Sequence, residues 1–187
     1  MRETLSVPPE EKPVREILAR AEVLRRLHWG RRVRIHRLAN IKAGSCTEDC
    51  GFCAQSVRFD APIARWNFLS REEVLAQAAR ADEIGVAKVC YVAAIRGPSD
   101  AEIDRIAGCG REVKRTYPHL AVCLSLGLLQ EGQAEKLAAA GLDRFNHNLE
   151  TSERFYYQVC TTHDWRARRE TVRRVREAGI EACSGGI

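Results

Sequence analysis

Three cysteines stand close together in the segment NIKAGSCTEDCGFCAQS, as Cys46, Cys50 and Cys53. Thiolates are strong ligands for zinc and iron, so three of them in one short loop can converge on a single metal centre. Zinc normally takes four ligands, and a zinc site here would need a fourth residue from elsewhere in the chain. A [4Fe–4S] cluster held by three cysteines instead leaves one iron open, where a small molecule can bind.

Three further cysteines recur at wide intervals, as Cys90, Cys123 and Cys183 in KVCYV, AVCLS and EACSG. Their separations of 33 and 60 residues are close to one and two βα units of roughly 30 residues each. In a barrel the inward side chains of different strands stack in layers, so these thiols could bind a second metal centre. Each of them could also pack as a small buried apolar residue.

Helix and strand patterns alternate along the chain and must position these cysteines. Capping boxes, in which a glutamate follows a serine by three residues, begin two predicted helices at Ser70 and Ser99. The junctions DEIGV, AAAGL and REAGI each end a helix at a glycine and begin an apolar strand. With a first strand within residues 33–41, the predicted order is βαβαβαβαβ, which is typical of a parallel sheet covered by helices.

Right-handed crossovers leave two architectures for such a sheet, an open doubly wound sheet and a (β/α) barrel. We predict an α/β protein with an incomplete (β/α) TIM-type barrel of about five strands and four helices. A complete eight-fold barrel typically needs about 250 residues, so we expect the barrel domain at residues 33–187 to be truncated at its C-terminus. Residues 1–32 should form an N-terminal helical lead-in that is irregular around Pro8, Pro9 and Pro13.

The composition is that of a folded protein, with 45% apolar and 29% charged residues among 187. No apolar stretch is long enough to span a bilayer and no secretory signal is present, so we expect a cytoplasmic protein without membrane association.

A reducing cytosol disfavours disulfides and favours metal ligation or redox chemistry for the eight cysteines. The net charge of +5 is concentrated in residues 25–37 and 166–176, which we interpret as solvated helix faces rather than a nucleic-acid surface.

The first cysteine segment, with Phe52 just before its third cysteine, resembles the signature of the radical S-adenosylmethionine superfamily. Within this superfamily, the longer string around it, FNHNLETS at residues 145–152 and CSGGI at residues 183–187 resemble the biotin synthase family. The resemblance runs from about Asn40 to Ile187. It implies conversion of dethiobiotin to biotin, a reaction in which hydrogen is removed from two unactivated carbons. Acid–base chemistry cannot remove such hydrogens near neutral pH, and radical chemistry can.

The resemblance also implies the cofactors. Cys46, Cys50 and Cys53 would hold a [4Fe–4S] cluster whose open iron binds S-adenosylmethionine. The strand cysteines would hold a [2Fe–2S] cluster that serves as the sulfur source, with an arginine from a later strand as the fourth ligand. Cys109 and Cys160 match no ligand position and are interpreted as incidental thiols. A flavodoxin- or ferredoxin-type electron donor and a homodimer of the full-length protein are the implied partners, and nucleic acid is not among them.

A pocket wall is expected at FNHNLET, where Asn146, Asn148 and Glu150 alternate and should face one side of a strand. On the residues alone, this segment could equally be a polar loop. His147 should point to the opposite face and is interpreted as structural. Many relatives carry tyrosine in place of Phe52 and aspartate in place of Glu150, so both contacts can differ in this chain.

The resemblance assigns the remaining site residues. Lys42, Asn146 and Asn148 are expected near the substrate, although Lys42 could instead be a surface lysine. Arg168 is expected at the cofactor, although it could instead be a solvent-facing helix residue. The residues expected to contact S-adenosylmethionine are Phe52, Asn148, Glu150, Arg168, Gly185 and Gly186.

Three alternatives stay open at this point. Another radical enzyme on the same scaffold, acting on methyl groups or carbon skeletons, would share the loop cysteines but would not need Cys90, Cys123 and Cys183 in one layer. A zinc-dependent nucleic-acid-binding module would use the arginine-rich helices and would contain zinc without sulfide. An inactive fragment would be poorly soluble because its sheet keeps an exposed edge.

Overall fold

The computed structural model describes residues 13–186, and the chain divides into two units at the boundary between Arg34 and Ile35. In the described part of the first unit, α1 (Val14–Trp29) is supported by an ion pair between Glu22 and Arg26, one helical turn apart. The irregular start predicted around Pro8 and Pro9 lies outside the described residues. No helix among residues 13–186 is long and apolar enough to cross a membrane.

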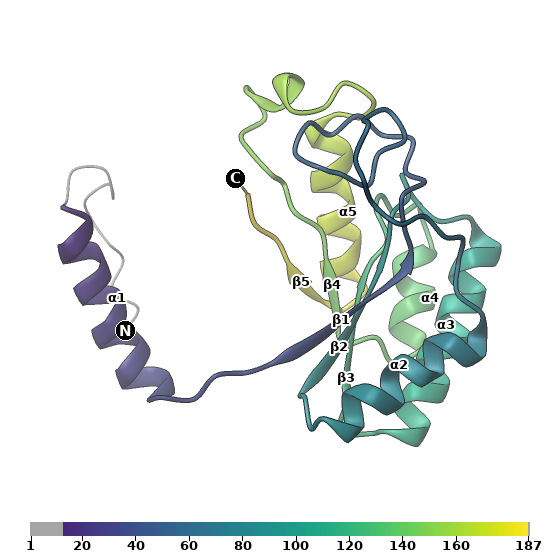
Figure 1. The fold of residues 1–187 in the computed structure, drawn as a ribbon, viewed down its shortest axis with the longest axis horizontal. Coiled ribbons are helices and arrows are strands. Elements are labelled where there is room, and N and C mark those ends of the chain that lie inside the picture. The colour runs from purple at the N-terminus through teal and green to yellow at the C-terminus, as the bar shows by residue number, and fades with distance from the viewer. Residues whose placement is uncertain (1–12, 187) are drawn as a thin grey trace. The chain divides into compact units, whose positions relative to one another are not determined.

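The second unit is built around a parallel sheet whose strand order follows the chain, β1-β2-β3-β4-β5 (Figure 1). The strands are β1 (His36–Lys42), β2 (Lys88–Ala93), β3 (Ala121–Ser125), β4 (Arg144–Asn146) and β5 (Glu181–Cys183). The helices between them are α2 (Arg71–Glu83), α3 (Asp100–Thr116), α4 (Gln133–Ala139) and α5 (Trp165–Glu177). A sequential parallel order without reversal is that of a (β/α) barrel and not of a doubly wound sheet. The predicted fold class is therefore confirmed, and the described residues form part of such a barrel.

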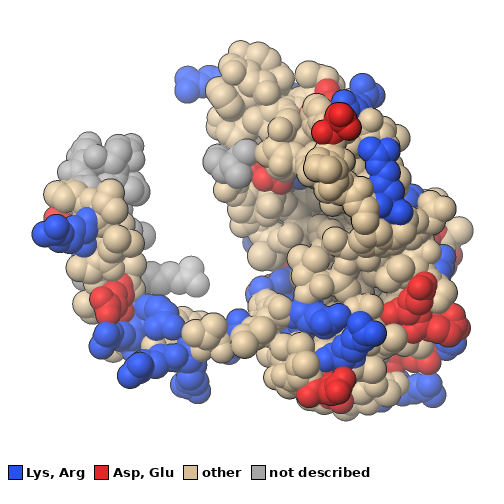
Figure 2. Space-filling model, in the orientation of Figure 1, with Lys and Arg blue, Asp and Glu red and all other residues tan. Residues whose placement is uncertain are grey.

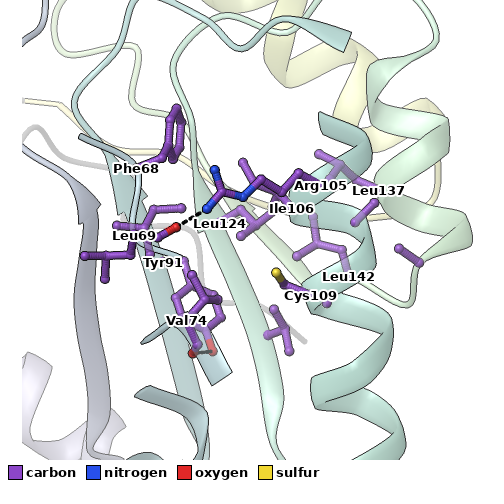
Figure 3. Close-up of a pocket in the computed structure, with 15 residues that line it drawn as sticks. Phe68, Leu69, Val74, Tyr91, Arg105, Ile106, Cys109, Leu124, Leu137 and Leu142 are labelled. Carbon is purple, nitrogen blue, oxygen red and sulfur yellow. Dashed lines mark hydrogen bonds between the residues drawn. The ribbon is translucent and has the colours of Figure 1, made fainter. Parts of the chain in front are cut away.

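The apolar core lies between one face of the sheet and the helices. Val89 and Tyr91 of β2 and Val122 and Leu124 of β3 are buried in it, because alternate residues of a strand point to the same face. Figure 3 shows side chains from the sheet and from α3 pointing toward one another in this layer, with Cys109 among them. Burial raises the pKa of Cys109, as expected for a thiol that packs as a core residue.

Both predicted capping boxes are present, and they fix where two helices begin. The Ser70 side chain accepts a hydrogen bond from the Glu73 backbone at 3.2 Å, and the Glu73 carboxylate accepts one from the Ser70 backbone at 2.7 Å. Ser99 and Glu102 repeat this arrangement at 3.3 and 2.7 Å. The helices α2 and α3 thus begin at defined points.

The strand predicted at FNHNLET is shorter than its sequence pattern indicates. β4 ends at Asn146, and Glu150 adopts a left-handed backbone conformation with φ of 66°. The expected alternation of Asn146, Asn148 and Glu150 along one strand is therefore wrong beyond its first residue. The backbone of this segment continues beside the end of β5, where Glu150 pairs with Gly186.

Two long loops lie next to each other beyond the carboxyl ends of the strands (Figure 1). One loop joins β1 to α2 over residues 43–70, and the other joins β4 to α5 over residues 147–164. The Gly51 backbone N–H donates to the Val159 carbonyl at 2.9 Å, which ties the two loops together. In (β/α) barrels this end of the sheet is where functional loops gather.

Candidate metal centre and cofactor site

The loop cysteines, Cys46, Cys50 and Cys53, lie on a loop with its own backbone hydrogen bonds. Cys46 donates to the Gln55 carbonyl at 3.1 Å, and Cys53 donates to the Cys50 carbonyl at 2.9 Å. All three loop cysteines line one cavity that opens to solvent. Burial raises the pKa of Cys46, and burial together with the neighbouring Cys160 raises that of Cys50 to about 12. A bound metal ion would oppose these shifts by stabilising the thiolates.

Most residues predicted for the cofactor and substrate line this same cavity. They are Lys42, Phe52, Asn146, Asn148, Glu150 and Arg168. The ammonium of Lys42 also lies 5.0 Å from the centre of the Phe68 ring, a cation–π contact that orients it. The structure therefore brings residues from the ends of β1 and β4 and from α5 to the loop cysteines.

His147 differs from the prediction that it points to the opposite face. It lines the same cavity as its two asparagine neighbours and is only 6% exposed. The reason is that β4 ends one residue earlier, so strand alternation no longer applies to it. Burial lowers the pKa of His147 to about 3, and among the described residues its Nε2 atom has no hydrogen-bond partner.

Arg168 is directed into the site and not toward solvent. Its guanidinium donates to the Asn148 carbonyl at 2.8 Å and to the Tyr156 hydroxyl at 2.6 Å. It lies 3.5 Å from a Glu150 carboxylate oxygen and 3.8 Å from the Cys50 sulfur. Arg168 therefore connects the predicted pocket wall to the cysteine loop, and its positive charge favours the Cys50 thiolate.

Gly185 and Gly186 do not line the cavity but support residues that do. The Gly185 N–H donates to the Asn148 side-chain oxygen at 3.1 Å. A Cβ atom at Gly186 would lie 2.5 Å from the Glu150 carbonyl oxygen, so only glycine permits this close approach. The two glycines thus position Asn148 and Glu150.

A polar network between the two loops was not predicted from the sequence. The Asp49 carboxylate accepts hydrogen bonds from the Thr161 and Thr162 backbones at 2.9 and 3.2 Å. Hydrogen bonds from the Thr161 side chain and backbone hold the pKa of this carboxyl well below its usual range. These contacts fasten the cysteine loop to residues more than a hundred positions later in the chain.

Glu48 forms the buried half of this network. Its carboxylate accepts from Thr162 Oγ1 at 2.9 Å and from Arg96 at 3.2 Å, and it contacts the His163 ring. Burial opposes ionisation of Glu48, but hydrogen bonds from Thr162 and His163 outweigh it and lower the pKa. Burial lowers the pKa of His163.

Cys160 is part of this network and is not an isolated thiol. Its sulfur lies 3.7 Å from the Cys50 sulfur and 3.3 Å from His163 Nδ1. The sequence pattern gave no ligand position for Cys160 and no signal for His163, because their neighbours come from a loop far away in the chain. A His three residues after a Cys is a spacing that could have drawn attention to the pair.

The strand cysteines, Cys90, Cys123 and Cys183, lie on the sheet face opposite to the helices. Their strand neighbours, such as Val89, Val122 and Ala182, pack in the helical layer. Cys90 and Cys123 face each other across paired strands. Cys183 pairs with Asn146, two residues beyond the Arg144 that pairs with Cys123. Two of these three cysteines are therefore level in the sheet, and the third lies two positions further along its strand.

The thiols of Cys90 and Cys123 interact directly. A hydrogen bond from Cys123 lowers the pKa of Cys90, and the same bond raises that of Cys123. Lys88 and Arg144 lie near enough to favour thiolates at both positions. Facing thiols beside positive charges have the chemistry of ligands for a metal cluster.

The loop and strand cysteines fit the clusters that the sequence resemblance implies. Every cysteine is free, so no disulfide removes a ligand. The loop trio lines an open cavity, which leaves room for a small molecule beside it. The ligands of a cube bind different irons, so their sulfurs need not approach one another as closely as ligands of one ion do.

Comparison with known proteins identifies the class. Residues 40–187 match the radical SAM superfamily, so the chain belongs to that superfamily. It is 46% identical over 181 residues to the biotin synthase of Salinibacter ruber, covering 97% of this chain and 50% of that protein. A biotin synthase of Thermus thermophilus is 45% identical over 184 residues, with 98% and 55% covered. The chain thus spans about half the length of the curated relatives it matches.

Solved structures support the fold. Methylornithine synthase superposes with a TM-score of 0.80 at 20% identity, covering 97% of this chain and 52% of that one. The hydrogenase maturase HydG superposes with a TM-score of 0.77 at 20% identity, covering 98% and 41%. Membership of the radical SAM superfamily implies a [4Fe–4S] cluster and S-adenosylmethionine.

Proposed function

We propose that this protein is a biotin synthase, which inserts sulfur into dethiobiotin. The observation that supports this best is the occurrence of two cysteine trios, one on the β1–α2 loop and one on β2, β3 and β5. A radical enzyme for methyl or carbon-skeleton chemistry needs the loop trio but not the three strand thiols. The 40–46% identity to proteins named biotin synthase points the same way.

Cys46, Cys50 and Cys53 would hold the [4Fe–4S] cluster, and Cys90, Cys123 and Cys183 would supply ligands to the [2Fe–2S] cluster. When bound, the [4Fe–4S] cluster would supply the electron that cleaves S-adenosylmethionine to a 5′-deoxyadenosyl radical, and the [2Fe–2S] cluster would supply the sulfur that enters the product. The protein's own task is to orient two small molecules and to exclude water around a radical.

The residues around the cavity can divide this task between them. Glu150 and Asn148 offer oxygens and an amide to the ribose hydroxyls, and Arg168 holds both in place. Phe52 offers an aromatic face near the adenine. Lys42 at the end of β1 and Asn146 at the end of β4 line the same cavity, where a carboxylate and a urea-like ring of dethiobiotin would find a cation and an amide.

The partners follow from the same proposal. A flavodoxin- or ferredoxin-type protein would deliver electrons, the full-length protein would be a homodimer, and the reaction would take place in the cytoplasm. We propose no nucleic-acid partner. Lys and Arg mix with Asp and Glu over the face of residues 35–186 in Figure 2, unlike the one-sign surface that phosphate backbones attract.

Replacement of Cys123 tests the sulfur-donor role. In the whole protein, reconstituted without oxygen, Cys123→Ala should retain the cleavage of S-adenosylmethionine to 5′-deoxyadenosine but form no biotin, as measured by mass spectrometry. Cys109→Ala, which removes a core thiol, is the matched control and should keep both products. Biotin formation by Cys123→Ala at the level of the control would reject the proposal.

A further inference from the structure

A second metal-ligating group lies beside the loop cysteines. Among residues 13–186, Cys50, Cys160 and His163 form a group of three ligand atoms that all lie within 4.8 Å of one another. Cys50 and Cys160 are buried, and the His163 side chain is only 4% exposed. The group joins the β1–α2 loop to the β4–α5 loop, and the proposed function uses only one of its three members.

Two of the three distances within this group are close to those around one tetrahedral ion. Zinc binds thiolate sulfur at about 2.3 Å and imidazole nitrogen at about 2.0–2.1 Å, which places two sulfurs about 3.8 Å apart and a sulfur and a nitrogen about 3.5 Å apart. The two sulfurs here are 3.7 Å apart, and the Cys160 sulfur is 3.3 Å from His163 Nδ1. The third pair, Cys50 and His163, lies within 4.8 Å, so its two ligand atoms would approach each other by up to about 1.3 Å on binding one ion.

Polar side chains surround the three ligand atoms. His163 Nε2 lies 2.7 Å from the Tyr156 hydroxyl and accepts a hydrogen bond from Arg168 at 3.1 Å, which orients the ring. His163 Nδ1 contacts the Glu48 carboxylate as well as the Cys160 sulfur, so a metal ion at Nδ1 would replace the proton that this nitrogen shares with Glu48. The Asp49 carboxylate accepts a hydrogen bond from the Cys160 thiol at 3.2 Å but is not one of the three grouped ligand atoms, so a water molecule would complete the coordination of the ion. Arg168, 3.8 Å from the Cys50 sulfur, favours its thiolate.

We propose that Cys50, Cys160 and His163 bind a single divalent transition-metal ion, with Zn²⁺ as the best fit to two thiolates and an imidazole. Because Cys50 is shared, this ion and the iron–sulfur cube exclude each other. The mutual exclusion of zinc and the cube rests on the proposed function, in which Cys50 is a ligand of the cube. The zinc site itself does not depend on that proposal. Zinc bound here would keep the protein free of the cube.

Zinc titration of the metal-free chain, without oxygen and against a chromophoric chelator, tests the site. One equivalent should bind, and both Cys160→Ala and His163→Gln should weaken binding by at least about tenfold. Cys53→Ser, which removes a loop cysteine outside the group, and Cys109→Ala should bind zinc like the unaltered chain. Circular dichroism of the metal-free variants shows whether each is folded, and Co²⁺ in place of Zn²⁺ reports thiolate ligation by its charge-transfer absorption.

The variants separate this site from the loop trio. Unchanged zinc affinity in both Cys160→Ala and His163→Gln would overturn the proposal, and so would loss of zinc in Cys53→Ser to the extent seen in Cys50→Ser. The exclusion has its own measurement. One equivalent of zinc should reduce the iron and sulfide taken up on reconstitution of the unaltered chain but not of Cys160→Ala. If the unaltered chain bound a full cube and a full equivalent of zinc together, the mutual exclusion of zinc and the cube would be wrong, but the zinc site would still stand.

Discussion

At the scale of single residues, the site is built from side chains that two distant loops contribute. The spacing of Cys46, Cys50 and Cys53 is visible in the chain, and all three line one cavity. Cys160 and His163 reach the same place from over a hundred residues away. No local spacing in the sequence predicts that Cys160 and His163 contact the β1–α2 loop, because this contact depends on how the two loops pack.

The contacts of Arg168 predict how its replacement should change the binding of S-adenosylmethionine. Arg168→Lys keeps a positive charge but loses the planar group that reaches Asn148 and Tyr156 together. We expect the KM for S-adenosylmethionine to rise about tenfold, equivalent to about 1.4 kcal/mol. The rate of 5′-deoxyadenosine formation against S-adenosylmethionine concentration measures it.

Arg169→Lys is the matched control for that experiment, since the next residue of α5 is exposed. Its KM should not change. Equal KM values for the two variants would show that Arg168 does not position the nucleoside.

At the scale of elements, the strands and helices of the barrel follow from local patterns, whereas their ends do not. Capping serines and apolar runs predict α2, α3, β2 and β3 because the signals lie within each element. β4 was expected to run through Glu150 but ends at Asn146. Its end is set by the approach of the 147–150 backbone to Gly185 and Gly186 of the neighbouring segment, which no pattern within FNHNLET reveals.

The junction after β3 gives a prediction of stability. Gly127 has φ of 73°, and a Cβ atom there would overlap the Arg96 carbonyl oxygen. Gly132 has a similar φ of 78°, but nothing lies within 4 Å of its Cβ position. Gly132→Ala should lower the free energy of unfolding by roughly 1 kcal/mol, and Gly127→Ala by roughly 3 kcal/mol or more. Urea denaturation of both variants measures this difference. Equal losses of unfolding free energy would mean that the loop around Gly127 accommodates the added Cβ atom without a further loss of stability.

At the scale of the whole molecule, burial of one histidine should make folding depend on pH. The pKa of His147 is about 3 in the folded protein and about 6.5 in an unfolded chain. Between these values the unfolded chain binds a proton that the folded one does not, so stability falls as pH falls. From pH 7 to pH 5 the loss from this group is about 2 kcal/mol.

Urea denaturation at both pH values tests this expectation. His147→Gln should lose about 2 kcal/mol less than the unaltered chain between pH 7 and pH 5. His119→Gln, which replaces a histidine whose side chain is 65% exposed, should keep the full dependence. An unaltered pH dependence in His147→Gln would show that this histidine is not buried in its neutral form.

The central claim is that three loop cysteines hold an iron–sulfur cube with one iron left open for S-adenosylmethionine. Electron paramagnetic resonance of the anaerobically reconstituted and reduced protein tests it most directly, together with iron and sulfide analysis. We expect the signal of a reduced [4Fe–4S] cluster whose spectrum changes when S-adenosylmethionine is added, and no such signal in Cys46→Ala. Absence of a cube from the folded protein, or a cube whose spectrum ignores S-adenosylmethionine, would contradict the claim.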